Sequence, residues 1–178
     1  MKIIRNFYNY NTKIKTYNHS EFRKLIYGSG GQANDKTIFH RIKYLHHTDF
    51  DFVINDEQFY YIVLFKGKKI IGIAKLGYYP NSSKSETEYG ISFLSIDKDY
   101  RGRGYSHLLV DNMFKLASEK GLDVATSLYT YAGFTKLKPL FNKYANKYNV
   151  QFRDKDGKSL MDAKWMYDDK INLLPKYE

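Results

Sequence analysis

Two glycines and two arginines stand together where an apolar segment gives way to a predicted helix. Residues 93–106 read Phe-Leu-Ser-Ile-Asp-Lys-Asp-Tyr-Arg-Gly-Arg-Gly-Tyr-Ser. Glycines let backbone N–H groups approach a ligand closely, and the first turn of a helix carries N–H groups without internal partners. With the charges of Arg101 and Arg103, the pattern predicts a site for phosphate groups. The same residues also fit a plain strand-to-helix turn with two exposed arginines.

The turn differs from two other glycine-rich phosphate motifs. It is not a Walker loop, because no Gly-Lys-Ser or Gly-Lys-Thr follows it. It also lacks the third glycine of the dinucleotide-binding fingerprint.

A third glycine-containing motif matches the turn more closely. The turn resembles the acetyl-coenzyme A signature of the GCN5-related N-acetyltransferase (GNAT) family, Arg/Gln-x-x-Gly-x-Gly/Ala at the start of a helix. Residues 101–106 fit this signature except at the last position, where Ser106 replaces glycine or alanine. Serine is small and starts helices well, so the departure is compatible with the signature.

The resemblance extends over roughly residues 59–152 and implies the family's fold. That fold belongs to the α/β (α+β) class, with a mixed, mostly antiparallel twisted sheet and helices on both faces. The sequence contains no repeat and no proline-rich linker, which predicts one domain over residues 1–178.

Hydrophobic spacing predicts the elements that would position the turn. In the N-terminal part we expect a strand near residues 2–8, a helix capped by Ser20 and ended by Gly28, and a second helix capped by Asp35. A three-stranded meander should follow and lead into the turn, with strands at residues 60–65, 70–76 and 88–96.

Beyond the turn, alternating helices and strands are expected. The prediction is a helix over residues 106–120 ended by Gly121, a strand over 123–128, a helix over 136–147, and a closing hairpin from residue 150. Pro139 must lie in the first turn of its helix, because deeper inside it would remove a backbone hydrogen bond.

The resemblance implies where acetyl-CoA would bind. In the family, the strand before the signature splays from its neighbour, and its free backbone groups bind the pantetheine arm. The N–H groups of residues 102–106 would hold the pyrophosphate, and a backbone N–H near Leu94 would meet the oxyanion. The cofactor-binding residues implied are Leu94, Ser95, Ile96, Arg101, Gly102, Arg103, Gly104, Tyr105 and Ser106.

The resemblance also suggests catalytic residues. The family often uses a glutamate of the third meander strand as base, which indicates Glu88, with Glu86 two residues earlier as an alternative. The family's acid is a tyrosine in a later helix, which indicates Tyr144, although the asparagine that usually starts that helix is absent here. Tyr129 and Tyr131 are alternatives for the acid.

Composition excludes several classes of chemistry. The chain has 178 residues and no cysteine, so disulfides and cysteine nucleophiles are excluded. It has no apolar run long enough to span a bilayer and no leader pattern, which predicts a cytoplasmic protein that does not bind membranes. Adjacent His46 and His47 with His40, Asp49 and Asp51 match no ligand pattern, so we expect no metal.

The sequence therefore predicts an N-acetyltransferase that moves an acetyl group from acetyl-CoA to a primary amine by direct attack, as a monomer or homodimer. Its formal charge of +10 suits acidic acceptors such as tRNA or aminoacyl-tRNA, and proteins or peptides are equally compatible. Cationic small amines would need a local acidic patch, for which Asp49, Asp51, Asp56 and Glu57 are candidates. The alternative is a non-catalytic binding module of the same fold, for example one for nucleic acid.

Overall fold

The computed structural model describes residues 11–27, 40–42, 44–45, 59–78, 88–126 and 135–154. The chain forms two compact units. The first comprises Met1–Lys75 with Phe93–Leu109, and the second comprises Leu76–Ser92 with Val110–Glu178. Two strands and one helix pass from one unit to the other, and the single domain expected from the sequence stays a prediction.

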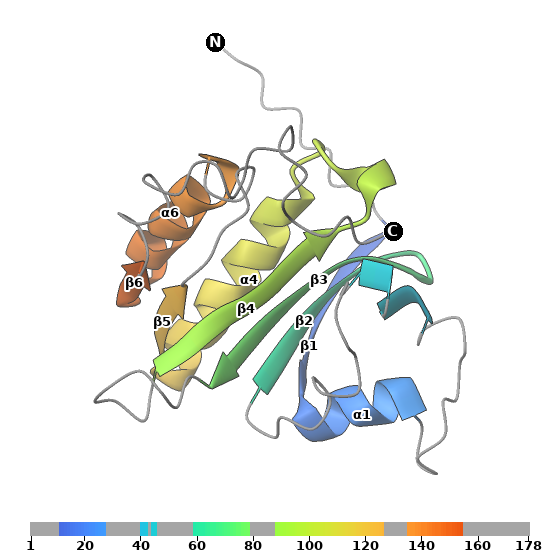
Figure 1. The fold of residues 1–178 in the computed structure, drawn as a ribbon, viewed down its shortest axis with the longest axis horizontal. Coiled ribbons are helices and arrows are strands. Elements are labelled where there is room, and N and C mark those ends of the chain that lie inside the picture. Colours follow the sequence, from blue (N-terminus) through green and yellow to red (C-terminus); the bar gives the residue numbers. More distant parts are fainter. Residues whose placement is uncertain are drawn as a thin grey trace, which may run out of the picture. The chain divides into compact units, whose positions relative to one another are not determined.

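The described strands form one six-stranded sheet in the order β1-β2-β3-β4-β5-β6 (Figure 1). Strand β1 is antiparallel to β2, whereas β5 is parallel to both β4 and β6. The sheet is therefore mixed, as the sequence predicted. The strands are β1 Thr12–Asn18, β2 Phe59–Lys66, β3 Lys69–Tyr78, β4 Glu88–Ile96, β5 Asp123–Thr126 and β6 Phe152–Asp154. The helices are α1 His19–Tyr27, the 3-10 turn η1 Lys98–Tyr100, α4 Tyr105–Lys120 and α6 Lys138–Tyr148.

One face of the first unit packs against α1. Successive residues of a strand point to opposite faces, and Phe59, Tyr61 and Val63 of β2 belong to the same buried cluster as Phe22 and Ile26 of α1. The ring of Phe22 stacks on that of Tyr61, with 3.8 Å between centroids. Two residues of the predicted second helix, Ile42 and Leu45, are helical and join this cluster.

The opposite face of this unit is covered by the start of α4. Ile62 and Leu64 of β2 point away from the face formed by Tyr61 and Val63, and both are fully buried. On β3, Ile73 joins the α1 cluster, and the neighbouring Gly72 points the other way: a Cβ there would lie 3.3 Å from Leu109 Cδ1 of α4. Helices therefore cover both faces, as expected.

The structure corrects the prediction at the N-terminal end. A strand, β1, covers residues 12–18, which sequence reasoning missed; the strand expected near residues 2–8 lies outside the described residues. The cap of α1 is Asn18, not Ser20. Asn18 Oδ1 accepts a hydrogen bond from Glu21 N, and Glu21 Oε2 accepts one from Asn18 N, both at 2.9 Å. This reciprocal pair is a capping box, which places Ser20 inside the helix.

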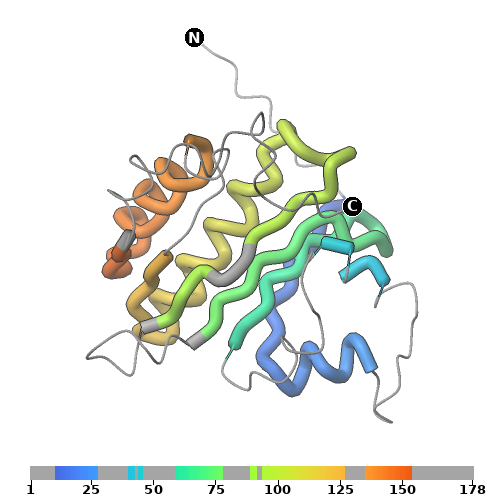
Figure 2. Tube along the Cα trace, in the orientation of Figure 1, coloured from blue at the N-terminus to red at the C-terminus, as the bar shows by residue number. Residues whose placement is uncertain are grey.

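The meander and the following helix were predicted correctly. Strands β2 and β3 meet at a tight turn in which Gly67 has a φ of +60°. Strand β4 has the predicted bounds, and α4 ends at Gly121, whose φ is +66°. Figure 2 traces the chain from β4 through η1 into α4. The expected apolar face of α4 is buried at Leu109, Met113 and Ala117, and Leu116 is half-buried.

In the second unit, α6 begins one residue before Pro139, which lies in the first turn as required. An aromatic cluster joins three elements: Phe114 of α4 and Phe141 of α6 both contact Phe152 of β6 edge-on, at 5.8 and 5.9 Å between centroids. Strand β6 covers the start of the predicted closing hairpin, and the hairpin itself stays a prediction, since the residues beyond 154 lie outside the described part.

A polar contact also joins α4 to α6. Asp111 Oδ1 accepts hydrogen bonds from Lys147 Nζ at 2.6 Å and from Tyr148 Oη at 2.8 Å. Hydrogen bonding to Asp111, and secondarily to Tyr148, raises the pKa of Lys147 above its ordinary value. This contact holds the two helices together on the side of α4 that faces α6.

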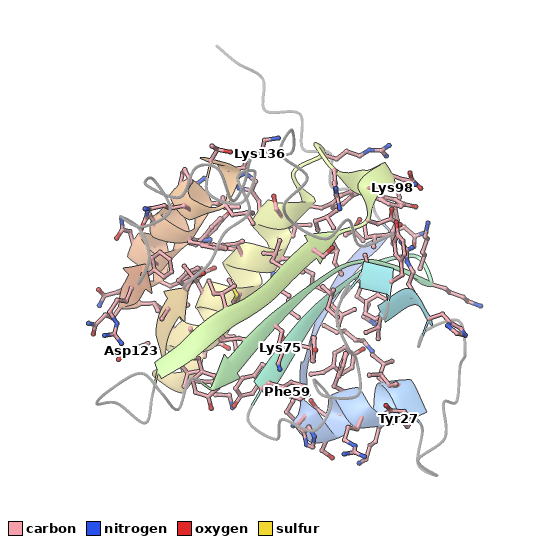
Figure 3. All side chains as sticks on the ribbon, in the orientation of Figure 1. Tyr27, Phe59, Lys75, Lys98, Asp123 and Lys136 are labelled. Atoms are coloured by element: carbon pink, nitrogen blue, oxygen red, sulfur yellow. The ribbon has the colours of Figure 1, made fainter. Side chains whose placement is uncertain are left out.

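A lysine is buried in the sheet of the first unit. Lys75 of β3 is 7% exposed, and its Nζ lies 4.9 Å from the ring centroid of Phe59 (Figure 3). An aromatic face attracts a cation, which offsets part of the cost of removing the ammonium group from water. No described helix is long and apolar enough to cross a bilayer.

Candidate active site

The glycine turn is attached to the sheet at Asp97, the residue after β4. The N–H of Asp97 donates to the carbonyl of Ile71 on β3 at 2.9 Å, and its own carbonyl accepts from Tyr100 N at 2.8 Å. Its side chain caps η1, because Oδ1 accepts from Asp99 N at 2.9 Å. A short polar side chain that bonds the backbone two residues on fixes a tight turn.

Asp97 is also the centre of a buried charge pair. The carboxylate is 3% exposed and forms an ion pair with the guanidinium of Arg41, while Lys69 Nζ lies 3.5 Å away. Arg41 Nε donates to the carbonyl of Ile70 at 2.7 Å. A buried carboxylate requires such partners, so Arg41 and Asp97 together fix the end of β4.

Sequence reasoning missed both residues of this pair. The Asp-x-Asp pattern at residues 97–99 is a signal for a capped turn and could have identified Asp97. Arg41 has no local signal, because it reaches Asp97 from a segment more than fifty residues earlier, and only the folded chain brings them together.

Arg101 connects the turn to the strand. Its Nε donates to the carbonyl of Ile96, the last residue of β4, at 2.9 Å. The remaining guanidinium N–H groups are separate donors in a planar fork. Arg101 therefore braces the turn through one nitrogen and has further donors to offer an anion.

The two glycines form an open cradle at the start of α4. Gly102 and Gly104 have φ values of +73° and +80°, a conformation that favours glycine. A Cβ at either position would meet no atom within 4 Å. Within the described chain, the N–H groups of residues 102–106 donate no backbone hydrogen bond, whereas His107 N donates to Gly104 O at 3.0 Å. Free N–H groups in open space at a helix N-terminus suit a pyrophosphate.

Residues 94–96 of β4, which the resemblance assigns to the pantetheine arm, lie directly before the turn. Leu94 is half-buried, and Ser95 and Ile96 are buried. The pairing of β4 with β5 covers Glu88 to Gly90, and β5 ends at Thr126 in the described part of the chain. Among the described residues, pairing with β5 therefore involves the first residues of β4, and the splayed strand that the resemblance implies stays a prediction.

The structure brings the predicted cofactor-binding residues together. All nine lie in the first unit, on the last part of β4, in the turn and in the first residues of α4. The Tyr105 side chain is buried and lies against the ring of Tyr100, with 6.2 Å between centroids, so it anchors the start of α4.

The two predicted catalytic residues lie in the second unit. Glu88 is the first residue of β4, paired in register with Asp123. Tyr144 is buried on α6, with the ammonium groups of Lys143 and Lys147 at 5.5 and 5.4 Å from its ring centroid. Their catalytic roles stay predictions. The alternatives Glu86, Tyr129 and Tyr131 lie outside the described residues.

Residues with metal-binding side chains do not gather in the described part. No group of three or more His, Cys, Asp or Glu side chains placed to hold a metal ion occurs there. The segment with His46, His47, Asp49 and Asp51 lies outside it.

Two solved structures share the fold. Both are of an aminoglycoside acetyltransferase from an uncultured soil metagenomic sample. The complex with trehalose has 18% sequence identity and a TM-score of 0.50, and the complex with sisomicin has 16% and 0.51. Each comparison covers 75% of this chain and 87% of the other. The chain matches no curated protein sequence.

The family comparison matches the chain directly. The model described as the acetyltransferase (GNAT) family matches residues 30–145, a range that includes β2 to β5, the glycine turn and most of α6. The chain belongs to the GNAT family and is an acyl-CoA-dependent N-acetyltransferase.

Proposed function

We propose that this chain transfers an acetyl group from acetyl-CoA to a primary amine by direct attack, with the donor held on residues 94–96 and 101–106. The observation that carries the proposal is the cradle at the start of α4. Gly102 and Gly104 leave open space where a Cβ would stand, and the N–H groups of residues 102–106 donate no backbone hydrogen bond to another described residue. Phosphate groups bind such positions, because the helix dipole adds to the hydrogen bonds.

The backbone of β4 positions the thioester. A backbone N–H near Leu94 faces the carbonyl oxygen of the acetyl group and stabilises the negative charge that develops there. The chain has no cysteine to accept the acetyl group, and direct attack by the amine requires no covalent enzyme intermediate. The new bond joins the amine nitrogen to the acetyl carbon, and the bond from that carbon to sulfur breaks.

Two side chains handle the protons in this proposal. Glu88 accepts the proton that the amine loses, directly or through water, and Tyr144 donates a proton to the departing sulfur. The amine must be neutral to attack, so a base at this point increases the reactive fraction. Glu88 belongs to β4, the strand in which the family's base is expected, and this supports the assignment.

The acceptor is a primary amine on a protein or peptide, an aminoacyl-tRNA or a small molecule. The excess of 29 lysines and arginines over 19 acidic residues favours an acidic acceptor over a cationic one. The acidic residues named as a possible patch for cationic amines, 49, 51, 56 and 57, lie outside the described part of the chain.

Calorimetric titration with acetyl-CoA tests the donor site. We expect binding in the micromolar range and its loss in Gly104→Val, because the side chain would occupy the space left for the pyrophosphate. Gly121→Val is the matched control. Gly121 lies at the other end of α4, also has a positive φ, and would also place its Cβ in open space.

Both variants place a side chain at a position of positive φ, so a difference in binding between the two folded variants reports the ligand. Binding that survives in a folded Gly104→Val protein would remove the cradle from the donor site. Absence of binding by the unmodified chain would refute the proposed donor. Once binding is established, release of free CoA thiol in a screen of amines identifies the acceptor.

A further inference from the structure

Three cations surround one tyrosine next to the glycine turn. Tyr100 ends η1, the turn on which Figure 3 labels Lys98. From the centroid of its ring, Lys69 Nζ lies at 5.0 Å, Lys66 Nζ at 5.5 Å and Arg103 Cζ at 5.7 Å. We call Lys66, Lys69, Tyr100 and Arg103 the Tyr100 cluster. Its members come from the end of β2, the start of β3 and the glycine turn.

The described acids do not neutralise this cluster. Among the described residues, Asp97 is the acid that pairs with the cluster: its carboxylate lies 3.5 Å from Lys69 Nζ. The same carboxylate also pairs with the guanidinium of Arg41. Neither Lys66 nor Arg103 forms an ion pair with a described residue. The aromatic face attracts each cation, but three like charges around one ring also repel one another. The arrangement is suited to an anion with more than one negative charge.

The cluster adjoins the proposed pyrophosphate site. Arg103 stands between the two cradle glycines and is also a member of the cluster, so the two sites share a residue. CoA carries a second phosphate, a monoester at the 3′ position of the ribose next to its pyrophosphate. A phosphate monoester has a charge of about −1.5 to −2 at neutral pH.

We propose that the Tyr100 cluster binds the 3′-phosphate of CoA and makes the enzyme select CoA over 3′-dephospho-CoA. The ring of Tyr100 gathers the two lysines on one surface, and their ammonium groups donate charge-assisted hydrogen bonds to the phosphate oxygens. This inference rests on the proposed donor site, because the pyrophosphate fixes the ribose beside the cluster.

The test compares two ligands that differ by one phosphate. Calorimetric titration of the unmodified chain should give a dissociation constant for CoA at least about tenfold lower than for 3′-dephospho-CoA. In Lys66→Gln/Lys69→Gln, CoA binding should weaken by about the same factor, while binding of 3′-dephospho-CoA stays within about twofold. The preference for CoA over 3′-dephospho-CoA then disappears, because only the binding of CoA weakens.

A charge-matched control excludes a general electrostatic effect. Lys24→Gln/Lys115→Gln removes the same formal charge from two exposed positions, on α1 and α4, and should keep the full preference for CoA. Thermal denaturation of each variant confirms that it is folded before titration.

Three results would overturn the inference. Equal affinity of the unmodified chain for both ligands would leave the donor site in place and remove the 3′-phosphate contact. If Lys66→Gln/Lys69→Gln weakened the binding of CoA and of 3′-dephospho-CoA equally, the two lysines would contribute to the pyrophosphate site and not to a contact with the 3′-phosphate. Loss of binding to a random-sequence RNA in this variant, with the CoA preference unchanged, would assign the cluster to nucleic acid. If the unmodified chain binds neither CoA nor 3′-dephospho-CoA, the proposed donor site itself fails.

Discussion

Asp97 shows how one side chain fixes the turn that carries the proposed donor site. Its carboxylate caps η1 and pairs with Arg41, and its main-chain N–H bonds to β3. A cradle for phosphate must be in place before the ligand arrives, since ordering it on binding would reduce affinity. Asp97 supplies this order from a buried position, and its carboxylate bonds to Asp99 N and pairs with Arg41.

Glu88 carries a prediction that depends on pH. If Glu88 removes the proton of the acceptor amine, Glu88→Gln should lower kcat by about 100-fold at neutral pH, where the amine is protonated. The loss should shrink as the pH approaches the pKa of the amine, because the neutral amine then needs no base. Steady-state rates of CoA release between neutral and alkaline pH measure this profile.

Asp123 offers the control for this substitution. It is the register partner of Glu88 on β5, so Asp123→Asn removes a carboxylate from the same end of the two paired strands. We expect the pH–rate profile of Asp123→Asn to match that of the unmodified enzyme. A profile for Glu88→Gln with the same shape as the unmodified one would eliminate Glu88 as the base.

At the scale of elements, the contact of β3, β4 and α4 holds the donor strand in place. A Cβ on Gly72 would lie 2.7 Å from Ile96 Cδ1 and 3.3 Å from Leu109 Cδ1. Because Gly72 of β3 has no side chain, the last residue of β4 and the first turns of α4 can pack closely against β3. Ile96 is also the residue whose carbonyl accepts from Arg101, so this packing reaches the turn.

Gly72→Ala should therefore destabilise the protein by about 1 to 3 kcal/mol through overpacking. Urea denaturation gives the change in the free energy of unfolding.

The double variant Gly72→Ala/Ile96→Val isolates the cause of this loss. Ile96→Val removes the Cδ1 atom that the new methyl group would strike, and alone should cost about 0.5 to 1.5 kcal/mol. The double variant should be more stable than the sum of the single effects predicts. Strict additivity would show that Ile96 is not the obstacle.

For the whole molecule, the excess of positive charge governs the encounter with the acceptor. The formal net charge is +10, and such a charge attracts acidic molecules and repels cationic ones over a distance limited by salt. We expect kcat/KM for an acidic acceptor to fall between about 20 and about 300 mM sodium chloride, and kcat/KM for a polycationic acceptor to rise. Initial rates at limiting acceptor concentration measure both.

A neutral amine of similar size is the control, since its kcat/KM should change little with salt. An acidic acceptor with a flat salt profile would show that net charge has no part in acceptor choice.

Local sequence determined the parts of this protein that depend on local interactions. The β-branched and aromatic residues of 60–65 predicted β2, and the glycines at 67 and 121 stand where the backbone needs a positive φ at the ends of β2 and α4. The position of Gly102 and Gly104 before a helix specified the cradle, because glycine geometry and helix ends are properties of neighbouring residues. The family resemblance rested on these same residues.

The rest was decided by tertiary structure. Every residue of β1 is exposed or half-buried, so the strand depends on the hydrogen-bonding edge that β2 provides. Ser20 and Asn18 are both good caps, and Asn18 is selected because β1 ends there. The pairing of Arg41 with Asp97 and the gathering of Lys66, Lys69 and Arg103 around Tyr100 join residues far apart in the chain. Contacts of this kind arise only when strands and turns pack, so no local pattern of residues can specify them.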